Sequence, residues 1–242
     1  MESVIIGSTL SALSTGLGAI PILFLNRVTH RWRDILLAFT AGIMVSASTF
    51  SLIPEALLLG NLTILTIGLF LGVFILNLLE KFIPHIDLEH SPMNITIDRK
   101  ALLVIAAITL HNLPEGLSVG VSYASDKEEI GNLIAFAIGL QNAPEGFLVA
   151  LFLVNQNISK WKALLIATMT GAVEIITALL GYTLSSVVAN LVPYGLSFAA
   201  GSMLFIVYKE LIPESHGDGN ERSATYSFIT GLIVMIYLTQ LF

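Results

Sequence analysis

Two six-residue motifs carry imidazole, amide and carboxylate groups at the same spacing: HNLPEG at 111–116 and QNAPEG at 141–146. In each motif the first residue and the glutamate are four positions apart, so in a helix they share one face. The asparagine lies three positions before the glutamate and is slightly offset around the helix axis. Because a carboxylate has two acceptor oxygens, each glutamate can serve two adjacent sites.

These side chains predict a site for a divalent cation. Imidazole, carboxylate and amide oxygen suit hard or borderline ions such as Zn²⁺, Fe²⁺ and Mn²⁺. The chain has no cysteine, which excludes thiolate ligands, disulfides and a cysteine nucleophile. Pro114 and Pro144 cannot donate to the carbonyls of Leu110 and Leu140, which leaves those oxygens available to a cation or to its bound water.

The elements that must position these groups are membrane helices. Of the 242 residues, 55% are hydrophobic and 12% charged, whereas a soluble domain has about 25% charged residues. This composition excludes a water-soluble globule, and continuous apolar runs of about 20 residues indicate transmembrane helices rather than strands. We predict an all-α membrane protein whose single domain, 1–242, has eight helices near 3–25, 34–59, 61–82, 99–124, 130–154, 160–188, 192–213 and 223–242.

The positive charges predict the orientation of this domain. Ten of the eleven lysines and arginines fall in or beside the loops that follow odd-numbered helices, and only Lys127 follows an even-numbered one. Because cytoplasmic loops are enriched in these residues, that side should be cytoplasmic. We therefore expect a multi-pass protein of the cell membrane with both termini extracytoplasmic.

The chain also repeats itself. LIPE occurs at 52–55 and 211–214, five helices apart, and the two central motifs lie on consecutive helices. Weaker matches align Thr15-Gly16 with Thr170-Gly171 and Gly68-Leu69 with Gly231-Leu232. This order predicts a 3+2+3 arrangement of inverted repeats around a central pair, a plan typical of transporters with a midplane site.

Ionisable groups near mid-membrane are functional candidates because each carboxylate there costs about 2.5–3.5 kcal/mol. A lone histidine such as His111 is equally well explained as a packing residue, but the joint set favours a metal path. At the periphery, Glu55 falls near an expected entrance, and Glu214 and His216 near an expected exit. The mid-membrane candidates are His111, Asn112, Glu115, Gln141, Asn142, Glu145 and Glu174.

The paired motifs, the eight helices and Glu174 in GAVEIITALLG together resemble the ZIP (Zrt-, Irt-like) metal-transporter family. The resemblance implies movement of Zn²⁺, and of Fe²⁺, Mn²⁺, Co²⁺ or Cd²⁺, into the cytoplasm by an elevator-type motion in a homodimer. It implies no cofactor, since the metal is the transported substrate. A first position would use His111, Glu115, Gln141 and Glu145; a second would use Asn112, Asn142 and Glu174, with the other two glutamates bridging.

The chain departs from that pattern at Gln141 and Asn142, where many members have histidine and some have an acidic residue. Both departures should lower the affinity of the site for metal. The loop after the third helix carries His85 and His90, too few for a metal tract. The alternative function is an intramembrane metal-dependent hydrolase, which the absence of HExxH disfavours; a proton or organic-anion carrier fits three carboxylates poorly. No nucleic-acid partner is expected.

Overall fold

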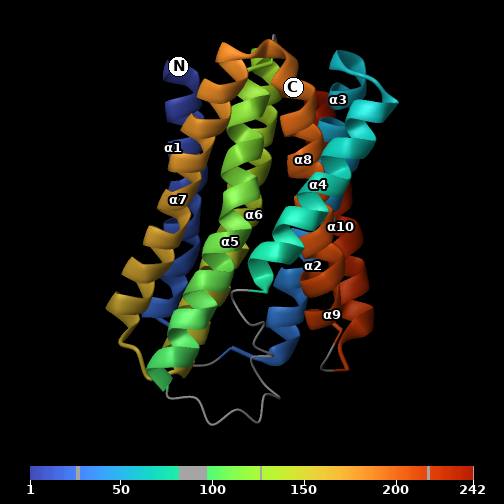
Figure 1. Ribbon diagram of the computed structural model, residues 1–242. Coiled ribbons are helices and arrows are strands. Elements are labelled where there is room, and N and C mark those ends of the chain that lie inside the picture. The colour runs from blue at the N-terminus through green and yellow to red at the C-terminus, as the bar shows by residue number, and fades with distance from the viewer. Residues whose placement is uncertain (26–27, 82–96, 126, 217–218, 242) are drawn as a thin grey trace.

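The structure is a computed structural model that describes the chain except residues 26–27, 82–96, 126, 217–218 and 242. Every regular element in the described part is helical (Figure 1). The α-helices are α1 (Glu2–Ala19), α2 (His30–Ala47), α3 (Ile53–Leu59), α4 (Leu62–Glu80), α5 (Ile97–Tyr123), α6 (Glu128–Asn155), α7 (Lys160–Val187), α8 (Val192–Ile206), α9 (Ile212–Glu214) and α10 (Glu221–Leu241).

These helices confirm an all-α membrane protein. Seven helical stretches of the described part are long and apolar enough to span a membrane. The remaining long helix, α5, has 27 residues, or about 40 Å at 1.5 Å per residue, which is also enough. Large apolar side chains face outward, with Phe70 71% and Trp161 72% exposed, as expected for a surface in contact with lipid.

The helix boundaries agree with the predicted ones to within a few residues. The largest shift that the described part allows us to measure at a helix start is in the second span, which begins at His30 rather than at Asp34. Hydropathy marks the apolar part of a helix, whereas its backbone hydrogen bonds continue into the polar residues beyond. Both chain termini lie at one end of the bundle, and the loops near Lys160 and Arg222 lie at the other (Figure 1).

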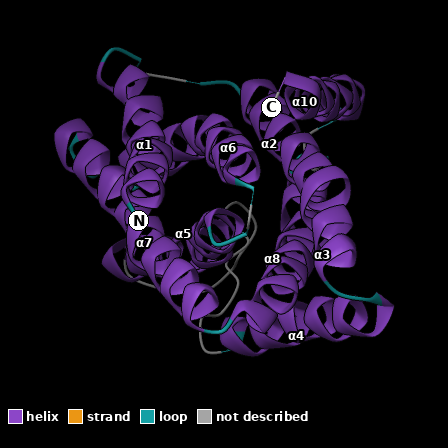
Figure 2. Cartoon of the chain, turned by 90° about the horizontal axis from the view of Figure 1, so that it is seen from above, coloured by secondary structure: helices purple, strands orange, loops and turns teal. Residues whose placement is uncertain are grey.

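The helices form two groups, as the view along the bundle shows (Figure 2). In the first group, α1 packs on α6, α5 on α7 and α1 on α7; in the second, α2 packs on α10 and α4 on α8. The seam between the groups is formed by α5 against α8 and by α6 against α2. The two motif-bearing helices therefore line this seam.

The helices that carry the two LIPE sequences share an unusual local structure. Five-residue π-helical turns occur at Ser48–Leu52 and Val207–Leu211, which are 159 positions apart. Each turn precedes a proline, Pro54 or Pro213, and lets the residue before that proline bond the carbonyl five residues back. An extra residue in the turn accommodates the ring, which cannot donate to a carbonyl four residues back.

The same offset of 159 corrects the weaker matches expected from the sequence. A Cβ on Gly72 would lie 2.2 Å from the Phe198 carbonyl oxygen, and a Cβ on Gly231 would lie 2.2 Å from that of Phe39. Gly231 is therefore equivalent to Gly72 and not to Gly68. The error is one helical turn, because small residues recur at that spacing wherever helix backbones approach closely.

Candidate functional site

The two motifs meet halfway along α5 and α6. Gln141 Nε2 donates to Glu115 Oε1 at 2.7 Å, and both side chains are fully buried. The prolines of the motifs lie inside continuous helices and do not interrupt them. Close approach of the backbones holds this centre together: a Cβ on Gly116 would lie 2.4 Å from the Glu174 carbonyl oxygen. Glycine is required there because any side chain would separate α5 from α7.

A second set of contacts surrounds Glu174 on α7. Asn142 Nδ2 lies 2.8 Å from Glu174 Oε1 and 2.9 Å from Oε2, and Ser11 Oγ on α1 donates to Oε2 at 2.9 Å. Asn112 does not join this set, because its Nδ2 donates to the Thr170 carbonyl at 2.8 Å. The structure thus brings Glu174 to Asn142, while Asn112 contacts the neighbouring turn of the same helix.

Several buried oxygens at this centre are left without a donor. Glu115 Oε2, Gln141 Oε1 and Asn142 Oδ1 have no hydrogen-bond partner among the described residues. The carboxyl group of Glu115 lies near those of Glu145 and Glu174. Buried acceptors without donors are costly, and oxygen atoms of this kind are what a divalent cation binds.

In this arrangement, however, no three His, Cys, Asp or Glu side chains within the described ranges are grouped as a ready metal cluster. Amide groups bond these carboxylates instead: the nitrogen of Gln141 donates to one oxygen of Glu115, and the nitrogen of Asn142 donates to both oxygens of Glu174. The structure therefore brings the candidate metal ligands close together, but their oxygen atoms do not point toward one common position.

His111 contacts a residue that the sequence did not single out. Its Nε2 lies 2.8 Å from Oε2 of Glu210, in the π-helical turn between α8 and α9. The pair crosses the seam between the two helix groups. A signal was present, since Glu210 is a carboxylate within a predicted membrane span. Beside it, Glu80 is within interaction range of Glu210 and forms an ion pair with Lys209.

The peripheral candidates lie at opposite ends of the bundle. Glu55, only 5% exposed at its side chain, accepts a hydrogen bond from Lys127 Nζ at 2.9 Å, and this ion pair also crosses the seam. Glu214 pairs with Arg33 at 3.6 Å within the second group, and His216 is exposed. His85 and His90 lie outside the described residues.

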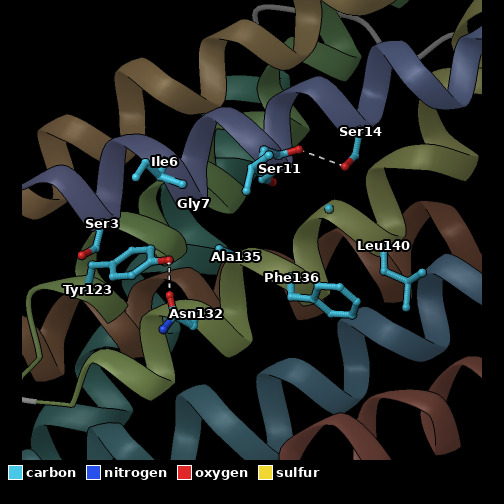
Figure 3. Close-up of a pocket in the computed structure, with 12 residues that line it drawn as sticks. Ser3, Ile6, Gly7, Ser11, Ser14, Tyr123, Asn132, Ala135, Phe136 and Leu140 are labelled. Carbon is cyan, nitrogen blue, oxygen red and sulfur yellow. Dashed lines mark hydrogen bonds between the residues drawn. The ribbon is translucent and has the colours of Figure 1, made fainter.

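A groove is lined by residues of α1 and α6, together with Tyr123 at the end of α5 (Figure 3). It encloses about 600 Å³, and its walls include Leu10, Phe136 and Leu140. In its wall Tyr123 donates to Asn132 at 2.8 Å. Ser11, which holds Glu174, also lines this groove, so the groove ends beside the second set of contacts.

With this geometry in hand, comparison with known proteins identifies the class. Residues 85–239 match the ZIP Zinc transporter family model. Zinc transporter GufA of Myxococcus xanthus is 36% identical over 98% of this chain and 98% of its own. Zinc transporter ZIPB of Bordetella bronchiseptica is 36% identical over 97% of this chain and 79% of its own. Zinc transporter ZupT of Clostridium perfringens is 30% identical over 96% and 93%.

The chain therefore belongs to the ZIP zinc transporter family. It is a multi-pass membrane protein of a family of transporters, which excludes the intramembrane hydrolase considered as an alternative.

Proposed function

We propose that the protein moves divalent transition-metal cations, Zn²⁺ foremost and Fe²⁺, Mn²⁺, Co²⁺ or Cd²⁺ as further substrates, across the cell membrane into the cytoplasm. The observation that carries the proposal is the buried donor set at the middle of the bundle. Glu115 on α5, Gln141 on α6 and Glu174 on α7 are fully buried, and the buried oxygens that accept no hydrogen bond suit a cation.

The first metal position would be formed by His111, Glu115, Gln141 and Glu145. Two movements would complete it. Gln141 must turn its amide nitrogen away from Glu115 Oε1 so that the amide oxygen faces the metal, and His111 must leave Glu210. Because both movements exchange an existing contact for a metal–ligand bond, the affinity should be moderate, as a transported ion requires.

The second position would be formed by Asn112, Asn142 and Glu174, with Glu115 and Glu145 bridging the two positions. Asn142 Nδ2 already faces Glu174 and Ser11, so its oxygen is directed elsewhere and is available. Asn112 would contribute its oxygen in the same way, because its nitrogen is engaged by the Thr170 carbonyl.

Alternating access would follow from movement of the α1, α5, α6 and α7 group against the other helices, in the manner of an elevator. Two contacts across the seam support this division: Lys127–Glu55 near the end with the termini, and His111–Glu210 toward the opposite end. In the predicted orientation the first contact closes the outer side. His111 would hand the metal toward Glu210 and Glu80 on the cytoplasmic side. We expect a homodimer.

The test is metal uptake by purified protein in liposomes. Wild type should accumulate Zn²⁺ or Cd²⁺ without chemically transforming any molecule. The double variant Glu115→Ala, Glu145→Ala should lose uptake to the level of empty liposomes. Lys162→Ala, on the exposed start of α7, serves as the matched control and should transport normally. Uptake that survives the double substitution would refute the proposed site.

A further inference from the structure

Ser11 connects three helices at the edge of the buried centre. Its side chain is 1% exposed, and its hydroxyl donates to Glu174 Oε2 at 2.9 Å. The same hydroxyl oxygen and the Ser11 carbonyl oxygen each lie 3.2 Å from Asn142 Nδ2. One residue of α1 therefore contacts two donors of the second metal position, although α1 supplies none of the proposed ligands itself.

Part of this arrangement comes from the inverted repeat. The offset of 159 makes Thr170 the equivalent of Ser11, and the carbonyl of Thr170 accepts from Asn112 as the Ser11 carbonyl accepts from Asn142. These backbone contacts recur in both halves and are explained by helix packing alone.

The hydroxyl contact is not repeated. Thr170 Oγ1 donates to the Ala167 carbonyl on its own helix, and the equivalent of Glu174 is Thr15, which has no carboxylate. The hydrogen bond from Ser11 to Glu174 therefore belongs to the asymmetric part of the structure, where the candidate metal position lies. Packing symmetry does not account for it.

The consequence of this contact is orientation. Two oxygens of Ser11 face the amide of Asn142, so its nitrogen points toward α1 and its oxygen points away from α1. The hydroxyl also pins one oxygen of Glu174 against the same residue. Groups that hold metal ligands in this way typically change metal affinity by 10–100-fold when they are removed.

We infer that Ser11 is a positioning residue for the second metal position, which fixes the carboxylate of Glu174 and the amide of Asn142 for a divalent cation. The inference rests on the proposed function. Ser11 borders the groove between α1 and α6 (Figure 3).

The first experiment compares Zn²⁺ binding to Ser11→Ala, Ser11→Thr and Ser14→Ala. Ser11→Ala should weaken the second equivalent of Zn²⁺ about tenfold and leave the first unchanged. Ser11→Thr keeps the hydroxyl and should restore binding. Ser14→Ala is the matched control, since Ser14 lies on the same groove and donates only to the Leu10 carbonyl of its own helix.

The second experiment repeats Ser11→Ala in a Glu174→Gln background. If Ser11 acts by orienting Glu174, removing the Ser11 hydroxyl should lower Zn²⁺ affinity little further once the carboxylate of Glu174 has been replaced. An undiminished tenfold loss in that background would overturn the inference, as would equal weakening of both equivalents. If Ser11→Ala folds poorly, Ser11→Cys retains the size with a weaker donor and must weaken the same equivalent.

The transport function and the positioning role of Ser11 are tested separately. The glutamate pair of α5 and α6 tests transport itself, and its outcome does not depend on Ser11. The Ser11 series is measured on wild type that takes up metal, so normal uptake with an unaltered second equivalent in Ser11→Ala overturns the positioning role and leaves the transport function standing.

Discussion

The contact between His111 and Glu210 yields a prediction with a definite sign. In this structure Nε2 of His111 lies 2.8 Å from Oε2 of Glu210. The side chain of His111 is 17% exposed and that of Glu210 is 8% exposed. Any interaction that holds His111 there competes with metal binding at the first position. Glu210→Gln should therefore strengthen metal binding and not weaken it.

The magnitude follows from the change in the acceptor. A hydrogen bond to a charged group contributes about 1.5–3 kcal/mol, and one between neutral groups about 0.5–1.5 kcal/mol. Replacing the carboxylate by an amide should thus weaken the competing contact by about 1.3 kcal/mol, the difference between the middles of these ranges. That difference is about tenfold in an equilibrium constant, so the dissociation constant of the first Zn²⁺ should fall by up to about tenfold.

The assay combines equilibrium Zn²⁺ binding with uptake into proteoliposomes. Glu210→Gln should bind Zn²⁺ more tightly yet transport it more slowly, because the contact that draws His111 away from the metal is weakened. His111→Ala in the same background is the control, and it should abolish the gain. A dissociation constant that rises or stays constant, or a gain that persists without His111, would refute the reasoning.

Three further predictions follow from other contacts. Lys127→Met should break the ion pair to Glu55, which contributes about 1 kcal/mol because the lysine is half-exposed. Labelling, from outside, of a single cysteine introduced into a chain that has none of its own should then rise about fivefold. Unchanged labelling would contradict a role for this ion pair in closing the predicted outer side. Gly231→Val should lower the free energy of unfolding by about 1–3 kcal/mol or more, measured by thermal denaturation, because its Cβ would meet the carbonyl of Phe39 at 2.2 Å. Asn142→Asp should lower thermal stability in metal-free buffer by adding a buried charge beside other carboxylates, and Zn²⁺ should restore it; a variant that Zn²⁺ does not stabilise would argue against the second position.

The predicted repeat relates the two parts of the seam, α6 against α2 and α5 against α8. The π-helical turns at Ser48–Leu52 and Val207–Leu211 have the same offset as the close contacts of Gly72 and Gly231. In the predicted inverted arrangement, contacts that close one side would have counterparts on the other. We expect such symmetry to give two states of similar free energy, which a small differential interaction can interconvert.

The sequence alone determined the elements and the chemistry of the candidates. Continuous apolar runs define membrane helices because each span must satisfy its own backbone hydrogen bonds, and the HNLPEG and QNAPEG motifs supply the donors on one helix face. Family membership was also legible in these motifs. All of these features are local in the chain, so spacing and composition suffice to read them.

Only the tertiary structure decided which side chains meet. His111 contacts Glu210, 99 positions away along the chain, and Glu174 accepts from Ser11, 163 positions away, as well as from Asn142. No periodicity links these residues. The register of the repeat was also decided by packing, since backbone approach at Gly231 selects Gly72 over Gly68, one turn away. Contacts between distant helices depend on their relative height and rotation in the bundle, and the pattern of a single helix carries neither quantity.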